Sequence, residues 1–543
     1  MSKLEYYKIE TAKNFNSLVT ADKLIAYAKE KEMSAIGIAD VQNMASVMDV
    51  YTLAKKQNIT PIISVQFRVY GIISHDWLYV TLIAKNYAGY KEILSLHNVV
   101  ATKGNGKSER LELKEIPKLQ HVIATLSINE AIKDERTILV SNIIKGLKDR
   151  VGQENLWIEI EPAFSQEDKK VQLKVLEEAK KTELTTIAAP TIRYFEKKQK
   201  VALDAMQRAR NEQKGFYNTG VTTNYFLTEE EISEGYSQTP ESVQQTLKLK
   251  MLCNVKMPVK GTPEYKKKMV RFKVPKDFNV PFQLEKMFDA KKGFVLPQDE
   301  QTVREIGFLC YLAWEAMKVK YANHPQYEEI KKRLKHELGM TIADDEVNYT
   351  LVIQGFIRHG RTDDITFGPG RGSVVGSMLA YCLDVIEIDS YKEGLLYERY
   401  KNEYRADDQD MDIDVAKSDR SALLRNIQKE YGEHHMAKLI TFNAHGAKDA
   451  LSSIGKLYKM PESIIKKLKA PMSKVKGVIE EVLEKEVLLK EIREMFKEVD
   501  EVLYIVQLIQ HLPKSKSIHT AGIVLSENDI RQELPVFLQY DDE

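Results

Sequence analysis

The first 255 residues alternate short apolar runs with amphipathic stretches. Residues 35–39 and 61–65 are short and apolar, as buried strands are, and residues 45–56 between them have helical spacing. Two strands joined by a helix predict parallel pairing, because the helix returns the chain to the end of the sheet where the first strand began. We therefore expect an α/β domain over residues 1–255.

The pattern becomes mostly helical after residue 256. Residues 256–290 combine prolines and lysines without a period and indicate a linker. The spacing of apolar residues then predicts helices within residues 299–338, 348–359 and 478–510. Strand character returns at residues 519–526, so we expect the chain to re-enter a sheet there.

A glycine-rich turn, Gly-Pro-Gly-Arg-Gly-Ser at residues 368–373, precedes an apolar run. Glycines such as Gly370 and Gly372 permit backbone angles that are closed to other residues. Ser373 is a favourable N-cap for a helix that we expect over residues 374–383. A helix N-terminus presents free N–H groups to an anion, and Arg371 adds a fixed charge with several donors. The turn is a candidate phosphate site.

Acidic and apolar residues alternate at Asp410-Met-Asp-Ile-Asp414. Alternation has the period of a strand, which places Asp410, Asp412 and Asp414 on one face, with neighbouring Cα atoms roughly 7 Å apart. Such carboxylates repel each other unless cations bind between them. Two metal ions held by carboxylates serve phosphoryl and nucleotidyl transfer. Combined with a phosphate site, the acidic segment indicates nucleotide chemistry.

Each of these two features also has a simpler interpretation. Glycine turns precede many helices that bind no phosphate, and an acidic strand is often a solvated edge or a calcium site. The turn is not a P-loop, because no Lys-Ser/Thr pair follows the appropriate glycine. It is not a dinucleotide fingerprint either, because Val375 stands where a third glycine is needed.

The order of several motifs closely resembles the bacterial replicative DNA polymerase III alpha subunit, a C-family DNA polymerase. The palm motif of that family is similar to Gly368–Tyr381 of this chain. Further similar segments follow in the family's order at Leu395–Arg399, Asp410–Asp414, Tyr431-Gly432, Leu439–Phe442, Ala447-Lys448, Gly455 and His519–Ser526. Each motif alone is weak, but their shared order and spacing are specific.

The N-terminal region resembles the polymerase-and-histidinol-phosphatase (PHP) domain that begins these alpha subunits. The similar segments are Ala39–Asn43, Leu82–Asn86 and Tyr225–Thr228. The resemblance implies a PHP-like α/β barrel followed by a nucleotidyltransferase palm of the polymerase beta type, with a helical thumb inserted. It divides the chain into a PHP-like domain at 1–255, linker and first part of the palm at 256–458, thumb at 459–511 and an incomplete return to the palm at 512–543.

The metal ligands of a working PHP domain are not found in this sequence. A His-x-His pattern is replaced by Lys8-Ile-Glu10, and Val41-Gln42 stands where a histidine is common. Gln66 replaces an acid, and Thr191-Ile-Arg193 replaces Asp-x-His. Neutral and cationic side chains cannot hold several divalent ions together. We expect a metal-free scaffold, and the alternative of a PHP phosphoesterase lacks its ligands.

The resemblance also implies roles for the two central features. Asp412 and Asp414 would hold two Mg²⁺ ions for templated DNA synthesis, with Asp410 structural. Triphosphate binding would fall to Gly370, Arg371, Gly372 and Ser373. Candidate phosphate or DNA contacts are Arg399, Arg405, Lys448, Lys466, Lys467 and Lys469.

In the family the third catalytic carboxylate and the fingers lie beyond the position matching residue 543. We therefore expect the partners to be primer-template DNA, a deoxynucleoside triphosphate and a second polypeptide that carries the C-terminal half of the polymerase. The alternative is a folded fragment that binds DNA or a protein partner without catalysis.

Composition changes this picture little. Lysine plus arginine total 80 against 79 aspartate plus glutamate, so any DNA path must be a local patch. The three cysteines are far apart in apolar contexts and indicate reduced core residues. The sequence shows no signal peptide and no apolar run of ~20 residues, so we expect a cytoplasmic protein without a membrane partner.

Overall fold

A computed structural model describes residues 4–71, 76–103, 110–214, 223–265, 268–281, 283–284, 297–402, 411–473 and 476–538. The chain forms two compact units. The first consists of Met1–Tyr265, Leu439–Ala521 and Arg531–Glu543, and the second of Lys266–Lys438 and Gly522–Ile530. Among the described helices, none is both long and apolar enough to cross a membrane. The domain boundaries expected at residues 255, 458 and 511 stay a prediction.

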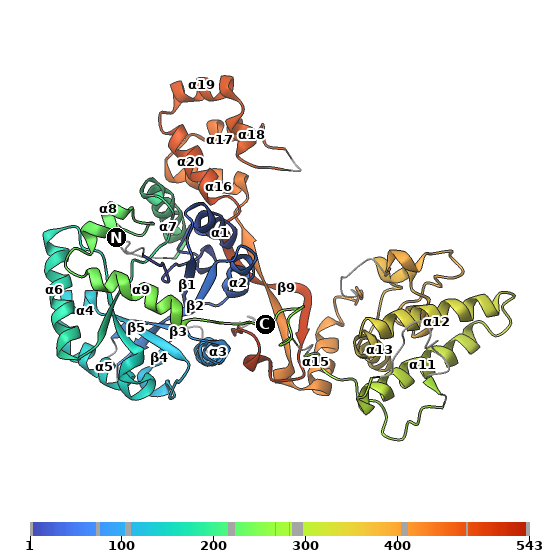
Figure 1. Cartoon of the computed structure of the whole chain (residues 1–543). Coiled ribbons are helices and arrows are strands. Elements are labelled where there is room, and N and C mark those ends of the chain that lie inside the picture. Colours follow the sequence, from blue (N-terminus) through green and yellow to red (C-terminus); the bar gives the residue numbers. More distant parts are fainter. Residues whose placement is uncertain are drawn as a thin grey trace. The chain divides into compact units, whose positions relative to one another are not determined.

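The first unit is built on a curled seven-stranded sheet (Figure 1). Its order is β1-β2-β3-β5-β6-β7, with β4 beside β2. The strands are β1 (Ala35–Val41), β2 (Thr60–Tyr70), β3 (Trp77–Ala84), β4 (Leu111–Glu112), β5 (Val122–Ser127), β6 (Leu156–Ile160) and β7 (Thr185–Ala188). β1 and β2 pair in parallel as predicted, but β3 is antiparallel to both of its neighbours. The short link between β2 and β3 explains this, since it cannot hold a crossover helix.

An N-terminal segment, residues 6–10, lies between the two edges of this sheet. It contacts β1, where the N–H of Gly37 donates to a carbonyl of the segment (2.8 Å). It also contacts the chain just after β7, where Ile9 forms a parallel bridge with Ile192. A Cβ on Gly37 would lie 2.6 Å from Cα of Tyr7, so only glycine permits this approach. The segment thereby joins the sheet edges, as a PHP-like barrel requires.

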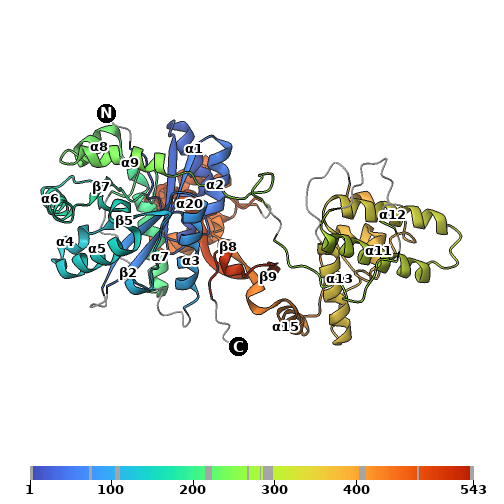
Figure 2. The same ribbon diagram turned by 60° about the horizontal axis from the view of Figure 1, so that its bottom comes forward.

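Helices cover the outside of the curled sheet (Figure 1, Figure 2). They are α1 (Ala21–Glu30), α2 (Val47–Lys56), α3 (Tyr87–Ala101), α4 (Asn129–Lys133), α5 (Thr137–Val151), α6 (Gln166–Lys181), α7 (Lys200–Lys214), α8 (Glu229–Gly235) and α9 (Pro240–Leu252). The strands are buried on both faces, and all five residues of β6 are buried. Continuous apolar strands are typical of a sheet that helices cover.

A second group of helices belongs to the same unit; its first helix lies at the end of the region predicted to be palm, and the others lie in the region predicted to be the thumb. It comprises α16 (Ala447–Leu457), α17 (Glu462–Lys469), α18 (Glu480–Leu483), α19 (Glu486–Met495) and α20 (Val499–Ile509). α16 and α20 pack against α7. One continuous cluster of buried apolar residues includes both Ile63 of β2 and Ile505 of α20. These helices therefore share their core with the barrel.

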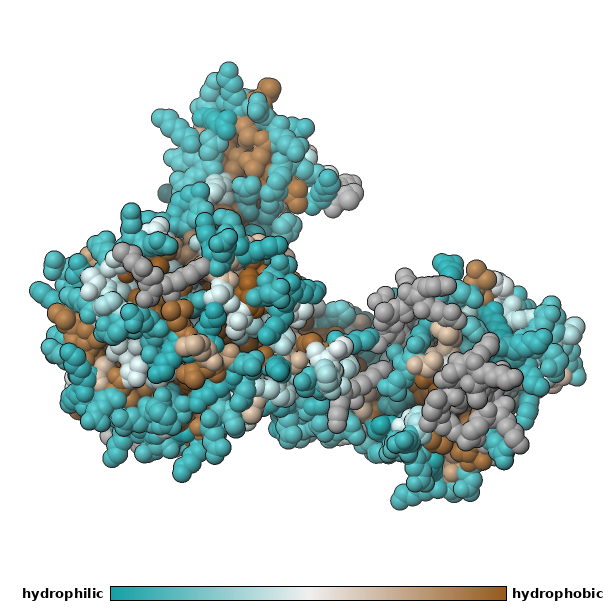
Figure 3. Space-filling view, in the orientation of Figure 1, coloured by the Kyte–Doolittle hydropathy of each residue, from teal (hydrophilic) through white to brown (hydrophobic). Residues whose placement is uncertain are grey.

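The second unit is mainly helical. Its core packs Leu309, Leu334, Leu351 and Met378 from four helices. The helices are α11 (Glu300–Lys320), α12 (Tyr327–Ala343), α13 (Val347–Thr362), α14 (Met378–Cys382) and α15 (Arg420–Tyr431). A two-stranded antiparallel ribbon of β8 (Met436–Ala444) and β9 (Pro513–Leu525) has residues in both units, and it confirms the strand expected at 519–526. On the face drawn in Figure 3, most of the surface is hydrophilic.

Candidate nucleotide-binding and metal site

The glycine-rich turn and the acidic segment lie side by side in the second unit. Phe367 forms an antiparallel bridge with Val415. Next to this bridge the N–H of Gly368 donates to the carbonyl of Asp414 (2.9 Å). A Cβ on Gly368 would lie 2.9 Å from Cβ of Asp414, so the first glycine of the turn is needed for this close approach. The backbone thus brings the two sequence motifs into contact.

Arg371 joins the two aspartates. Its Nε lies 2.9 Å from Oδ1 of Asp414, and its Nη2 lies 3.2 Å from Oδ1 of Asp412. The side chains of Asp412 and Asp414 are 44% and 53% exposed, so both remain accessible to a ligand. One guanidinium can reach both carboxylates only if they point to the same side. The structure therefore places both aspartates beside the turn at residues 370–373.

The acidic segment is not the regular strand that its alternation predicts. Residues 411–414 have no regular secondary structure, and only an isolated bridge at Val415 follows them among the described residues. A ladder needs a neighbour along its whole length, and the partner segment supplies only residues 366–368. Asp410 and Arg405, which were expected to be structural and to contact phosphate, lie outside the described residues.

The helix expected over residues 374–383 is broken in two. A 3₁₀ turn, η6 (Ser373–Gly376), precedes α14, and Ser373 is not an N-cap because Gly372 holds that position. The side chain of Ser377 caps α14 by accepting from the N–H of Ala380 (3.1 Å). The break follows from Gly376, whose Cβ would lie 2.6 Å from the carbonyl oxygen of Leu396.

The other candidate contacts are spread over both units. Arg399 is exposed in the 3₁₀ turn η7 (Tyr397–Arg399) of the second unit. The four lysines belong to the first unit: Lys448 in the first turn of α16, and Lys466, Lys467 and Lys469 in the last turn of α17. Lys467 pairs with an exposed glutamate (2.7 Å), and Lys469 donates to a serine hydroxyl. Exposed pairs of this kind are weak, so these lysines can exchange their partners for phosphate.

Comparison with known families finds a match for both parts of the chain. Residues 307–543 match the bacterial DNA polymerase III alpha NTPase domain, and residues 8–163 match the PHP domain. The two matches follow each other along the chain and leave residues 164–306 between them. The chain is thus similar to DNA polymerase III alpha in its C-terminal part and to PHP domains in its N-terminal part.

Curated relatives agree with this assignment. The DNA polymerase III subunit alpha of Campylobacter jejuni is 24% identical over 572 residues, which cover 99% of this chain and 46% of the relative. The Bacillus subtilis subunit is 24% identical over 553 residues, which cover 96% and 44%. The chain therefore spans about half the length of the alpha subunits it matches. A solved structure from Bifidobacterium adolescentis, assigned as a metal-dependent phosphoesterase, aligns with 44% of this chain and 98% of its own at 8% identity, and its TM-score of 0.23 supports no argument.

Inside the barrel, a buried ion pair involves Lys8, which belongs to the segment that replaces the family's His-x-His pattern. Nζ of Lys8 lies 2.5 Å from Oε2 of Glu159, and both side chains are buried. Burial opposes the charge of Lys8, but Glu159, Glu161 and Glu10 together outweigh it and hold the pKa of Lys8 above its ordinary value. The hydroxyls of Thr81 and Thr125 donate to the other oxygen of Glu159 (3.1 and 2.6 Å). Both oxygens of Glu159 are therefore already engaged by protein donors.

A second ion pair joins two more of the positions that depart from the family pattern, Glu10 and Arg193. Nη2 of Arg193 lies 2.8 Å from Oε1 of Glu10. The carboxylate of nearby Asp40 accepts from the N–H and hydroxyl of Thr11 (2.5 and 2.6 Å). The described part of the chain holds no group of three or more His, Cys, Asp or Glu side chains suited to a metal ion. This donor set does not fit a divalent metal, and the metal-free PHP domain stays a prediction.

In the polymerase part, the donors do suit a divalent ion. Asp412 and Asp414 offer carboxylate oxygens, which Mg²⁺ prefers, and a cation, the guanidinium of Arg371, already lies between them. The described residues supply only this pair of carboxylates, short of the three ligands of a complete group. Asp412 and Asp414 are therefore residues that could hold a metal ion, and their role as metal ligands stays a prediction.

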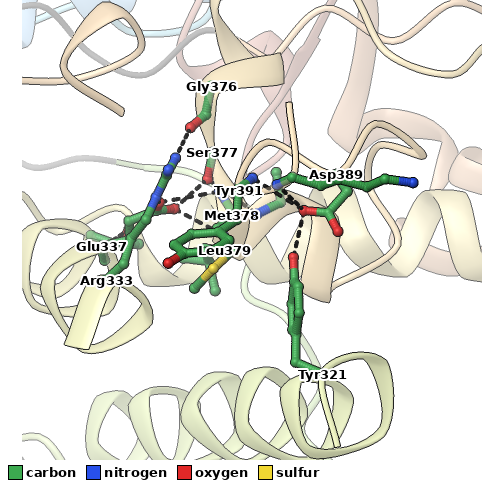
Figure 4. Close-up of polar contacts among 12 residues, drawn as sticks. Tyr321, Arg333, Glu337, Gly376, Ser377, Met378, Leu379, Asp389 and Tyr391 are labelled. Atoms are coloured by element: carbon green, nitrogen blue, oxygen red, sulfur yellow. Dashed lines mark hydrogen bonds and ion pairs between the residues drawn. The ribbon is translucent and has the colours of Figure 1, made fainter. Parts of the chain in front are cut away.

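Sequence reasoning missed a buried layer behind the glycine turn. Arg333 and Glu337 on α12 contact the backbone at residues 376–379 (Figure 4). On the sequence, both look like ordinary charges of an amphipathic helix. The available signal was weak: Glu337 falls on the apolar face that also carries Leu334 and Leu338.

Proposed function

We propose that this chain carries the nucleotide-binding and metal-binding part of a C-family DNA polymerase. The reaction is templated DNA synthesis, in which a primer 3′-hydroxyl attacks the α-phosphorus of a deoxynucleoside triphosphate and pyrophosphate leaves. One observation carries the proposal: Arg371 of the glycine turn contacts both Asp412 and Asp414. An anion-binding turn and an acidic pair are thereby combined in one place.

The turn supplies the groups that bind the triphosphate. Gly370 and Gly372 have positive φ angles (114° and 72°), which leave the backbone N–H groups of the turn unhindered by side chains. Ser373, at the first position of η6, adds an exposed hydroxyl. Arg371 exchanges its aspartate partners for phosphate oxygens when nucleotide binds, because guanidinium pairs with both in the same geometry.

Asp412 and Asp414 are the residues proposed to hold two Mg²⁺ ions. When bound, the ions would lower the pKa of the primer hydroxyl and neutralise charge on the leaving phosphates. The two aspartates orient this chemistry next to the turn. Their half-exposed carboxylates allow the primer terminus to approach.

DNA binding is proposed for the basic side chains outside this centre. Arg399, Arg405, Lys448, Lys466, Lys467 and Lys469 would neutralise backbone phosphates without reading sequence. Binding of this kind weakens steeply as salt rises, because counterions are released. A polymerase of this class acts on DNA in the cytoplasm.

Synthesis is proposed to need the half of the polymerase that relatives carry beyond the matched region. The chain covers only 46% and 44% of the first two relatives. A third carboxylate and the fingers would come from that half, which a second polypeptide can supply. The alternative, a fragment that binds DNA without catalysis, rests on the same observation.

Primer extension with purified protein tests the proposal. The full chain is assayed alone and with a polypeptide that carries the C-terminal half of the polymerase. We expect little extension by the chain alone, restored extension on addition, and loss of the restored activity in Asp412→Asn and Asp414→Asn.

The matched control is Glu393→Gln, an exposed acid of the same unit whose substitution should leave the restored activity unchanged. Strong extension by the chain alone would contradict the need for a second half. Activity that survives both aspartate substitutions would contradict their assignment. DNA binding without any restored synthesis would favour the non-catalytic alternative.

A further inference from the structure

Glu337 is a fully buried carboxylate whose four hydrogen-bond partners all lie near the glycine turn (Figure 4). Its side chain is 0% exposed. Oε1 accepts from Nε of Arg333 (2.9 Å) and from the N–H of Met378 (3.2 Å). Oε2 accepts from the hydroxyl of Ser377 (2.9 Å) and from the N–H of Leu379 (2.8 Å). The carboxylate therefore fixes the first turn of α14.

Burying this charge is unfavourable in itself. Burial raises the pKa of Glu337, although the N–H of Leu379 and the guanidinium of Arg333 counteract the shift. A helix as short as α14, with five residues, gains little stability of its own. The buried carboxylate fixes a short helix at an energetic cost. We therefore look for its role in the glycine turn and η6, which directly precede that helix.

Arg333 extends the contact into the 3₁₀ turn. Its Nη2 donates to the carbonyl of Gly376 (2.7 Å), the last residue of η6. On its other side, Gly376 lies against the carbonyl of Leu396, which leaves no room for a Cβ. The end of η6 is thus held between Arg333 and Leu396, while α12 holds the residues that follow.

The other end of the turn is fixed by separate contacts. Gly368 is bonded to the backbone of Asp414, and the N–H of Glu387 donates to the carbonyl of Pro369 (2.8 Å). Between these two anchors, Arg371 to Ser373 are exposed, and among the described residues they form no backbone hydrogen bond with another segment. The proposed triphosphate site is therefore a short exposed segment whose two ends, at residues 368–369 and at residue 376, are fixed by contacts with other segments.

We propose that Arg333 and Glu337 are positioning residues for the triphosphate, a role that rests on the proposed function. They act through Gly376 and Ser377 and do not touch the nucleotide. By fixing the end of η6, they hold the N–H groups of residues 372–374 in one orientation before the ligand arrives. Preorganisation of this kind raises affinity because less conformational entropy is lost on binding.

Binding measurements on the full chain test this role. A fluorescent deoxynucleoside triphosphate with Mg²⁺ reports on the turn, and Mn²⁺ alone, followed by electron paramagnetic resonance, reports on Asp412 and Asp414. Glu337→Gln keeps the side-chain volume but turns an amide donor toward backbone donors. We expect it to weaken triphosphate binding roughly tenfold, as loss of supporting hydrogen bonds typically does, and to leave Mn²⁺ binding unchanged.

The controls separate positioning from general destabilisation. Glu328→Gln lies on the same helix with a 74% exposed side chain and should match wild type in both assays. If Glu337→Gln does not fold, Arg333→Met takes its place, since it keeps the packing of the stem and removes only the contacts to Gly376 and Glu337. Arg333→Lys, which keeps the charge, should bind more tightly than Arg333→Met.

The outcomes distinguish this inference from the proposed function. If wild type binds no triphosphate, or if Asp412→Asn leaves Mn²⁺ binding intact, the proposed function fails. If wild type binds both probes and the variants at 333 and 337 bind the triphosphate equally well, the positioning role is wrong. Parallel loss of both probes with a lowered melting temperature indicates a purely structural role and also overturns it.

Discussion

Ionisable side chains in the interior of this protein either find an opposite charge or lose their own. Glu337 and Lys8 are of the first kind, since each is buried with a partner. His445, between β8 and α16, is of the second kind. It is 9% exposed, and burial together with Arg210 and Lys514 lowers its pKa to about 4. Such a histidine is neutral in the folded state at physiological pH.

The lowered pKa of His445 predicts a stability loss in acid. In the unfolded chain this imidazole takes up a proton below its ordinary value of 6.5, whereas the folded protein resists protonation down to about 4. The unfolding free energy should therefore fall as pH drops through this window, by roughly 2 kcal/mol from this group. Urea unfolding from pH 7.5 to 4 measures it.

The control for this prediction compares the pH dependence of the unfolding free energy between two histidine variants and wild type. His445→Asn should show a shallower pH dependence than wild type, while His434→Gln, which replaces an exposed histidine, should follow wild type. Equal slopes for His445→Asn and wild type would show that another group is responsible.

Residues that act locally could be predicted, and residues that act across the fold could not. Arg371 and the alternating aspartates were identified because each belongs to a short motif whose residue types and spacing indicate its chemistry. Glu337 was missed because Ser377, its partner, is 40 residues away along the chain. Spacing on a helix shows which face a residue occupies, but not which distant backbone that face meets.

Among the elements, the first strand-helix-strand unit was predicted correctly, whereas the single helix over residues 374–383 and the strand pairings that depend on a neighbour were not. β1, α2 and β2 follow from their apolar patterns. The reversal of β3 and the absence of a ladder at residues 411–414 depend on which segment lies alongside, which alternation does not record. The segment at residues 6–10 shows the same dependence, since it bridges the sheet edges without forming a named strand.

The ion pair between Lys8 and Glu159 should help to hold the segment at residues 6–10 in the barrel, which predicts a loss of stability when it is broken. Lys8→Met leaves a buried carboxylate without its cation and should lower the unfolding free energy by about 3–5 kcal/mol. Lys8→Met combined with Glu159→Gln should recover much of this loss, because no buried charge remains. Thermal unfolding of the full chain measures all three proteins.

Removal of metal provides the complementary test. Because Lys8 and Glu159 form a buried ion pair and the described residues hold no group of three metal ligands, EDTA should not change the melting temperature of the barrel. Lys114→Met, which removes an exposed lysine paired with Glu112, should leave stability almost unchanged. A melting temperature that falls with EDTA, or stoichiometric zinc or manganese in the purified protein, would refute the metal-free PHP domain.

Over the whole molecule, each compact unit is built from segments that are far apart in the sequence. The thumb helices are separated from the barrel by almost two hundred residues, yet they belong to the first unit and join its apolar cluster. The intervening residues build the second unit with its own core. The barrel therefore has a structural role of its own, since it supplies part of the core on which the thumb helices fold.

A shared core predicts shared unfolding. Ile505→Ala in α20 and Ile63→Ala in β2 each remove a fully buried side chain and should cost about 2–5 kcal/mol. Both should lower the same calorimetric transition and speed hydrogen exchange in barrel and thumb together. Leu334→Ala, in the core of the second unit, should instead affect exchange within residues 297–402. If Ile505→Ala unfolds the thumb helices while the barrel strands keep their protection, the two do not share one cooperative core, and the structural role of the PHP domain is wrong.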